Sequence, residues 1–250
     1  MQNVFTGCSS LTNFSVDNEN EFFAMQDGDG IIYSKDGTIL QLYPAGKTAS
    51  TFIVPERVTV IGATAFSGNT TLQSIDLKNV EIVNQAAFMD CTNLSSINAP
   101  KLKNVKYNAF ENTHWLNNNT DEFVSLGDVL IKYQGNAKEL HISGYTCIGP
   151  LAFANNTELE QIYFEDNELI FVRELAFTGC NNLEKIVIRK GGSTVSAVGL
   201  VLDLNSTCDI YVPSRLIDKY KTETDWGVYN DQLQDLIITI RFADGEELLD

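Results

Sequence analysis

The sequence predicts a β-rich solenoid in which short parallel strands stack coil on coil. Two observations carry this prediction: a repeated Ala-Phe pair, and a Leu that stands six residues after each Phe. Val4-Phe5 begins one further copy of the motif. A unit of about 22 residues cannot bury its own apolar face, so it must stack on copies of itself. The six aromatic positions are Phe5, Phe66, Phe88, Phe110, Phe153 and Phe177.

Apolar residues at fixed distances from the Phe predict two short extended segments in each unit. Alternating apolar and polar residues are typical of a strand with one buried side. Nine residues after the Phe stand Phe14, Ile75, Ile97, Ile162 and Ile186. Five residues before the Phe stand Ile61, Val83, Val105, Ile148 and Val172. Only the copy after Phe110 breaks the pattern, with Asn119 and Asp121.

The position three residues after the Phe always holds a small side chain that can form hydrogen bonds. The tight turns of a solenoid leave inward peptide groups that neither strand pairing nor water satisfies, and each costs free energy if it stays unpaired. We therefore expect a structural ladder of side chains at this position, with its cysteines reduced and buried. Cys147 and Cys208 have no assigned role, and five cysteines do not decide the redox compartment. The ladder residues are Cys8, Asn69, Cys91, Thr113, Asn156 and Cys180.

These motifs resemble the BspA-like class of the leucine-rich repeat superfamily, whose repeats read roughly Ile-Gly-x-x-Ala-Phe-x-x-Cys-x-x-Leu. The matching stretches are residues 61–72, 83–94, 148–159 and 172–183. The resemblance implies a leucine-rich-repeat solenoid with short helical turns, which we expect to cover residues 1–206. The segment from Ile210 to Trp226 is similar to the terminal piece common in that family.

Two β-hairpin insertions are predicted at about residues 17–50 and 117–138. Asp36-Gly37 and Gly127-Asp128 are turn signals between segments rich in β-branched residues. Both hairpins are expected to lie along one edge of the solenoid and to widen it. Residues 207–232 are predicted to form a C-terminal cap over the last coil, because an open solenoid end exposes strand edges. Residues 233–250 are interpreted as a terminal strand or the start of a further segment.

Composition excludes several classes of partner. Of the 250 residues, 33 are acidic and 17 are Lys or Arg, which gives a net charge of −16. Nucleic acid and anionic membranes would be repelled at long range. No apolar run approaches the roughly 20 residues needed to cross a bilayer, so no membrane insertion is expected. Residues 1–10 contain no secretion signal. The pattern begins in mid-repeat at Val4-Phe5, so we interpret the chain as a fragment of a longer one or as trimmed.

No motif for catalysis, cofactor binding or metal binding is present in the sequence. His114 and His141 have no metal-ligand spacing to each other or to cysteine, and are interpreted as structural or surface residues. Asp27-Gly28-Asp29-Gly30 lacks the spacing of an EF-hand and is interpreted as a turn. We expect no catalytic residue and no cofactor, so an enzyme whose site is assembled from distant residues is the remote alternative.

Solenoids present long continuous surfaces, which suit binding of macromolecules better than catalysis in a pocket. Outward positions of the last coils carry larger side chains than those of the first, and aromatic and Arg residues often dominate binding energy. We therefore name as candidate partner-binding residues Tyr163, Lys185, Val187 and Arg189. The competing interpretation of this corner is a solvated sheet face partly covered by the cap.

The family resemblance implies more about function. It implies a non-enzymatic protein-binding or adhesion module of a bacterial cell-surface or secreted protein. Host matrix proteins or other cell-surface proteins are its expected partners, and we expect a monomer in an extracellular or cell-surface location. The alternative is a structural spacer that displays another domain and has no ligand of its own.

Overall fold

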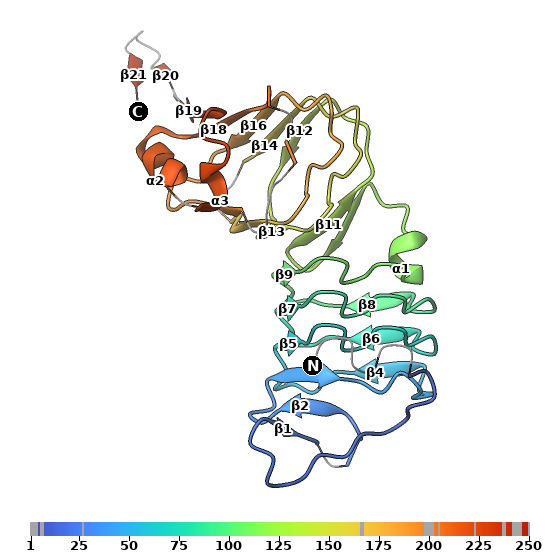
Figure 1. The fold of residues 1–250 in the computed structure, drawn as a ribbon. Helices are drawn as coiled ribbons and strands as arrows, with labels where there is room; N and C mark the ends of the chain where they lie inside the picture. The colour runs from blue at the N-terminus through green and yellow to red at the C-terminus, as the bar shows by residue number, and fades with distance from the viewer. Residues whose placement is uncertain are drawn as a thin grey trace. The chain divides into compact units, whose positions relative to one another are not determined.

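The computed structural model describes residues 5, 8–26, 28–165, 168–197, 203–204, 206–222, 224–236, 239–241 and 247–249. The chain divides into two compact units, residues 1–131 (unit 1) and residues 132–250 (unit 2). Each unit is a β-solenoid of short, mostly parallel strands with few helices (Figure 1). The predicted fold class is therefore confirmed. No helix in the described ranges is long and apolar enough to cross a membrane.

In two sheets of unit 1 the strands pair mainly in parallel from one coil to the next. One sheet has the order β1-β2-β3-β5-β7-β9 and the other the order β4-β6-β8. Ile61 lies beside Val83 in this register, and Val83 beside Val105. The strands are β1 (Phe23–Ala24), β2 (Ile32–Ser34), β3 (Ile39–Leu42), β4 (Thr51–Ile53), β5 (Val60–Ile61), β6 (Ser74–Asp76), β7 (Ile82–Val83), β8 (Ser96–Asn98) and β9 (Asn104–Val105).

The Phe column forms a file of stacked rings through unit 1. The ring centroids of Phe66 and Phe88 lie 4.8 Å apart with 18° between the planes, and those of Phe88 and Phe110 lie 5.5 Å apart with 4°. The backbone keeps the same register, because Phe66 N–H donates to Ala87 O and Phe88 N–H donates to Ala109 O, both at 2.8 Å. All three rings are buried. Like side chains therefore touch like across these coils, as the repeat predicts.

The first predicted hairpin is present, with β2 and β3 paired antiparallel. Asp36 stabilises its turn, because one carboxylate oxygen accepts hydrogen bonds from Ser34 Oγ and from Thr38 N–H. These bonds favour the ionised carboxylate and lower the pKa of Asp36 to about 2.

The second strand of this hairpin also begins a coil that the repeat pattern does not reveal. Leu40 pairs in parallel with Ile61, and Phe52 with Ile75. Tyr43 stacks on Phe66 at 4.7 Å, and its N–H donates to Ala65 O at 2.8 Å, so Tyr43 occupies the Phe position. β3 therefore belongs both to the predicted hairpin and to the stack of coils. The signal was hidden because Tyr43 follows a Leu instead of an Ala.

The first copy of the motif does not continue the file of rings. Phe5 packs edge-on against Phe14 at 5.0 Å, and both rings are only half-buried. Leu11 O accepts a hydrogen bond from Gly46 N–H, so this copy rests on its neighbour through backbone and not through its ring. Cys8 is exposed as a result, and the prediction that it is buried is wrong. Val4 lies outside the described residues.

The coil of Phe110 ends in the short helix α1 (His114–Asn117) and not in a strand. Thr113 caps this helix, since its hydroxyl accepts a hydrogen bond from Leu116 N–H at 3.2 Å. Trp115 packs edge-on against Phe110 at 5.6 Å. The second predicted hairpin follows and consists of β10 (Phe123–Leu126) and β11 (Val129–Tyr133), on either side of Gly127-Asp128.

Unit 2 repeats the same architecture. Phe153 and Phe177 stack at 5.2 Å with 9° between their planes. Tyr133 again takes the Phe position, because its ring lies 5.6 Å from that of Phe153 and its N–H donates to Ala152 O. One sheet contains β13, β15 and β17 as neighbours, and the other has the order β12-β14-β16-β18-β19. The strands are β12 (Glu139–Ile142), β13 (Cys147–Ile148), β14 (Gln161–Phe164), β15 (Phe171–Val172), β16 (Lys185–Ile188), β17 (Ser196–Ala197), β18 (Asp209–Pro213) and β19 (Leu233–Leu236).

Aromatic side chains close the coil that contains β17. The 3-10 helix η1 (Ser214–Leu216) and the helices α2 (Ile217–Thr222) and α3 (Thr224–Gly227) follow β18. Tyr220 OH accepts a hydrogen bond from Val195 N–H, and Trp226 Nε1 donates to Val195 O. Both peptide groups of Val195 are thus satisfied by buried aromatic side chains where another coil would otherwise supply backbone.

The tail contains a strand pair. β20 (Thr239–Arg241) pairs antiparallel with β21 (Glu247–Leu249). The sequence suggests one strand from Leu236 to Phe242, and Ile237, Ile238 and Phe242 lie outside the described residues.

Each regular coil contains two left-handed backbone positions, two residues before and two residues after the Phe. The later position holds Gly, Asn or Asp, which tolerate a positive φ. The earlier position holds Thr64, Ala86, Asn108, Leu151 and Leu175, with φ between 53° and 60°. A positive φ strains most L side chains, and a β-branched residue such as Thr64 most of all. Stacking therefore holds these residues in a conformation that they avoid when isolated.

We expect Phe88→Ala to lower the free energy of unfolding by about 3–5 kcal/mol, because it opens a cavity between two stacked rings. Urea denaturation of the purified chain measures this change. Phe22→Ala is the matched control, since Phe22 is 72% exposed and its loss should change stability by less than about 0.5 kcal/mol. A loss below about 1 kcal/mol for Phe88→Ala would show that the column carries little of the stability.

Thr64→Asn should raise the free energy of unfolding by about 0.5–1 kcal/mol, because Asn tolerates the left-handed conformation better than a β-branched residue. Asn108 already occupies the equivalent position of a later coil at φ 56°. Thr70→Asn, at an exposed site with ordinary φ, controls for composition. Equal effects of the two substitutions in thermal and urea unfolding would contradict the strain.

Candidate functional site

The strands of unit 2 present a row of large side chains on the outward side of one sheet. The parallel register places His141 beside Tyr163, Tyr163 beside Val187, and Val187 beside Tyr211. A second row runs parallel to it through Glu139, Gln161, Lys185 and Asp209. Glu165 directly follows β14 and Arg189 directly follows β16, and these two residues form a third row. We call these ten residues the sheet face.

The candidate partner-binding residues lie together on the sheet face, but they differ in accessibility. Arg189 is exposed, and Tyr163 and Lys185 are half-buried. Val187 is only 1% exposed, although it points outward, so it cannot contact a partner as predicted. It lies between Tyr163 and Tyr211, and large rings on both neighbouring strands cover a β-branched side chain between them.

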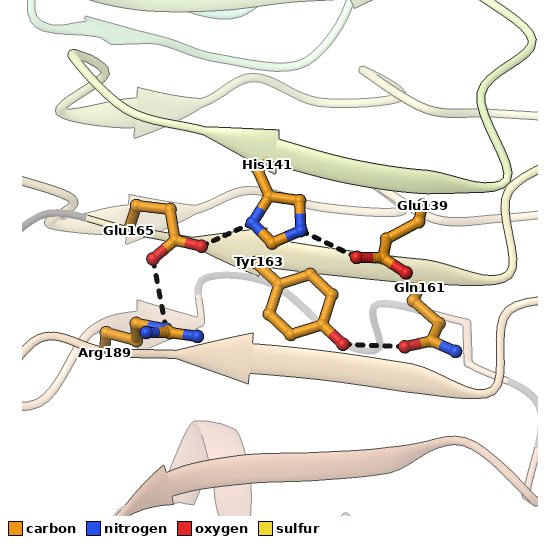
Figure 2. A network of polar contacts seen from close by, with 6 residues as sticks. All are labelled: Glu139, His141, Gln161, Tyr163, Glu165 and Arg189. Atoms are coloured by element: carbon orange, nitrogen blue, oxygen red, sulfur yellow. Dashed lines mark hydrogen bonds and ion pairs between the residues drawn. The ribbon is translucent and has the colours of Figure 1, made fainter. Parts of the chain in front are cut away.

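His141 occupies the centre of a network of charged groups (Figure 2). Its Nδ1 lies 2.5 Å from Glu165 Oε1, and its Nε2 lies 2.8 Å from Glu139 Oε1. Arg189 Nε holds the other oxygen of Glu165 at 3.0 Å. Hydrogen bonds to the two carboxylates raise the pKa of His141, because both favour the charged ring.

Rings and cations lock Tyr163 in place. The His141 ring stacks on the Tyr163 ring with centroids 4.3 Å apart and 1° between planes. Lys185 Nζ lies 5.4 Å from the Tyr163 centroid and 5.1 Å from the Tyr211 centroid, and the Arg189 guanidinium lies 5.9 Å from the former. Tyr163 OH donates to Gln161 Oε1 at 2.7 Å. Cations over aromatic faces are attracted by the ring quadrupole, so these contacts favour this arrangement of the side chains.

A shallow hollow of about 290 Å³ lies beside this row. Its walls mix one aromatic ring with carboxylate, amide, hydroxyl and ammonium groups. The residues that line it are Gln161, Glu184, Lys185, Thr207, Asp209 and Tyr211.

The corresponding face of unit 1 is different in chemistry. The outward residues of β6 and β8 are small and polar: Ser74, Asp76, Ser96 and Asn98. Asn98 Nδ2 donates to Asp76 Oδ1 at 3.0 Å, which joins two neighbouring coils. Only Ile53 of β4, at 63% exposure, offers a large apolar side chain there. In both faces, parallel strands pair residue for residue. Among the outward residues of these strands, the large aromatic and cationic side chains belong to unit 2.

Apart from the exposed Cys8, the predicted ladder residues fall into two groups by the bonds that they make. Asn69 Oδ1 accepts from Leu72 N–H at 2.8 Å, and Asn156 Oδ1 accepts from Leu159 N–H at 3.0 Å, so each amide closes a turn within its own coil. Thr113 closes the equivalent turn by capping α1. Asn69 Nδ2 is buried without a hydrogen-bond partner in the described part of the chain.

The buried ladder cysteines join neighbouring coils, as the Asn156 amide also does by donating from Nδ2 to Gly135 O at 3.0 Å. Cys91 Sγ lies 3.1 Å from Phe66 O, and Cys180 Sγ lies 3.0 Å from Phe153 O, each with the thiol as donor. Burial raises the pKa of Cys91 to about 12 and that of Cys180 to about 11. Such thiols are protonated at neutral pH and poor nucleophiles. All five cysteines lie in the described ranges and are thiols.

Two sheet-face residues with central positions were not among the candidates, namely His141 and Tyr211. Sequence reasoning treated His141 only as a possible metal ligand, and placed Tyr211 in the closing segment. Their spacing from residues of the neighbouring coils could have revealed them in the sequence. His141 stands 22 residues before Tyr163, which is one repeat, and Tyr211 stands 24 residues after Val187.

The geometry agrees with comparison against known proteins. The model of the BspA type leucine rich repeat region matches residues 45–125 and 124–198, with six copies. The chain belongs to this family. No curated protein matches its sequence.

Solved structures of bacterial leucine-rich repeat proteins are similar to this family member. The pneumococcal vaccine antigen PcpA is 22% identical, with a TM-score of 0.42 over 91% of this chain and 49% of its own. A leucine-rich repeat protein from Eubacterium ventriosum is 18% identical, with a TM-score of 0.38 over 74% of this chain and 50% of its own. The T. pallidum leucine-rich repeat protein is 20% identical, with a TM-score of 0.40 over 69% of this chain and 86% of its own. The chain thus spans about half the length of the first two.

Cys91→Ser should be tolerated better than Cys91→Leu. A serine hydroxyl can donate to Phe66 O in place of the thiol, whereas a leucine loses that bond and overpacks a buried site at a cost of about 1–3 kcal/mol. Urea denaturation of both variants measures the difference. Equal stability of the two would contradict a hydrogen-bonding role at this position.

Proposed function

We propose that the chain is a non-enzymatic protein-binding module and that its partner docks on the sheet face of unit 2. The observation that carries the proposal is the set of contacts among the large side chains there. Tyr163 is fixed by a stacked ring, by two cations and by a hydrogen bond to Gln161. A surface ordered before binding loses little side-chain entropy on association, which favours affinity. Tyr and Arg are also enriched among residues that dominate binding energy.

The cellular setting is part of the same proposal. Membership of the BspA type of repeat, together with the net charge of −16, supports a cell-surface or secreted module that binds host matrix proteins or other cell-surface proteins in an adhesion role. Nucleic acid is not the proposed partner, since a strongly acidic chain repels it. The proposed oligomeric state is a monomer.

Unit 1 suits a second role, that of a structural spacer. The outward residues of β6 and β8 are short and polar, and the hydrogen bond between Asn98 and Asp76 joins two neighbouring coils. The described face of unit 1 offers few side chains that could anchor a partner. We therefore propose that unit 1 serves as the spacer and that unit 2 binds the partner through its sheet face.

The test is a binding assay by biolayer interferometry against purified fibronectin, laminin and collagen. We expect at least one of them to bind, and the double variant Tyr163→Ala/Arg189→Ala to weaken that binding more than tenfold. The matched control is Asp76→Ala/Asn98→Ala, which alters the face of unit 1 and should leave affinity unchanged.

Two results would contradict the proposal. Equal affinity of the wild type and of the Tyr163→Ala/Arg189→Ala variant would place the docking surface elsewhere. The absence of binding to every matrix protein of the panel would count against the adhesion role.

A further inference from the structure

The contacts of His141 require a protonated ring. Both ring nitrogens face carboxylate oxygens, at 2.5 Å and 2.8 Å, and a carboxylate can only accept a hydrogen bond. A neutral imidazole carries one N–H, so it can satisfy one of the two carboxylates and would turn a lone pair toward the other. The arrangement in Figure 2 is therefore that of the imidazolium. Loss of the proton must release either Glu165 or Glu139.

Glu139 is the more weakly held of the two carboxylates. Glu165 is also held by Arg189 Nε at 3.0 Å, and its side chain is 30% exposed. The Glu139 side chain is 56% exposed and, within the described ranges, its carboxylate makes no hydrogen bond or ion pair besides the one to His141. The neutral ring is then expected to keep its proton on Nδ1, toward Glu165, and Glu139 becomes a solvated carboxylate beside Gln161 on the sheet face.

The other charged groups around His141 are already engaged. From β16, Arg189 holds Glu165, and Lys185 lies over the rings of Tyr163 and Tyr211. Beside β12, Lys138 is paired with Glu160 at 2.5 Å. None of these cations contacts Glu139. A released Glu139 thus has no counter-charge among the described residues and is available to a cation from outside.

We propose that Glu139 is an anchor for a basic segment of the protein partner, and that the protonation state of His141 controls access to it. This inference rests on the proposed function, because it places the anchor on the same sheet face. The net charge of −16 supports a basic partner, since such a chain attracts cationic surfaces at long range and repels acidic ones. At low pH the carboxylate is held by the imidazolium, and at higher pH it is open to Lys or Arg of the partner.

The first experiment needs no partner. Long-range ¹H–¹⁵N spectra of the full chain, with His114→Gln used to assign the two imidazoles, follow His141 from pH 5 to pH 9. We expect the neutral ring to be the Nδ1–H tautomer, and Glu139→Gln and Glu165→Gln each to lower the pH of its transition. A neutral ring in the Nε2–H form would show that Glu139 is retained, and would overturn the inference.

The second experiment measures binding of pentalysine by the full chain at pH 5.5 and at pH 8.5. We expect affinity to rise about twofold to fivefold over this interval, the range for one exposed ion pair. The rise should be absent in Glu139→Gln and in His141→Gln. Glu81→Gln is the matched control, because it removes an exposed, paired carboxylate from unit 1 and should keep the rise.

These outcomes separate the inference from the proposed function. The same pH dependence in Glu139→Gln as in the wild type would overturn the role of Glu139 as an anchor, whatever matrix protein binds. A different result would overturn the adhesion role alone. In that case no matrix protein binds, but His141 shows the expected tautomer and pentalysine binding shows the expected pH dependence, so the role of Glu139 is kept.

Discussion

The structure depends on one constraint, that equivalent residues of successive coils meet in register. A ring in the Phe position stacks on the next ring while its own N–H donates to the carbonyl of the Ala before that ring. The side-chain contact and the backbone bond specify the same offset, so a slip of one residue would break both. A coil that breaks the sequence pattern can therefore join the stack if it supplies an aromatic ring and a correctly placed N–H, as Tyr43 and Tyr133 do.

The same register places function-bearing side chains. On the outward side of a sheet, each coil places one residue in each row, beside the equivalent residue of the next coil. The chemical character of a row therefore depends on which residue each coil supplies. One such row of unit 1 holds Ile53, Asp76 and Asn98. One row of unit 2 holds His141, Tyr163, Val187 and Tyr211. The backbone of both units is equivalent, and the difference in chemistry lies in a few outward positions. The solenoid thus acts as a regular scaffold, and substitutions at a few outward positions are enough to create a binding surface on it.

Much of this fold could be predicted from residues, and the failures have physical causes. Identical Phe, Leu and Ile positions revealed the regular coils, and Asp36-Gly37 revealed a hairpin. The coils of Tyr43 and Tyr133 were hidden because no Ala precedes the ring. The left-handed backbone at Thr64 or Leu175 was equally hidden, because stacking imposes it against local preference. Val187 was misjudged because alternation predicts which way a side chain points but not whether neighbouring rings cover it. The role of His141 depends on three strands at once.

A double-mutant cycle on the ring file tests the central claim most directly. Phe→Leu variants at positions 66, 88 and 110 keep apolar volume while removing the stacked ring, and urea denaturation of single and paired variants yields coupling energies. Register stacking predicts a coupling of about 0.5–1.5 kcal/mol between Phe66 and Phe88 and between Phe88 and Phe110, and a value near zero between Phe66 and Phe110. Equal coupling energies for all three pairs, or no coupling between Phe66 and Phe88 or between Phe88 and Phe110, would contradict a file in which each ring contacts only the rings of the adjacent coils.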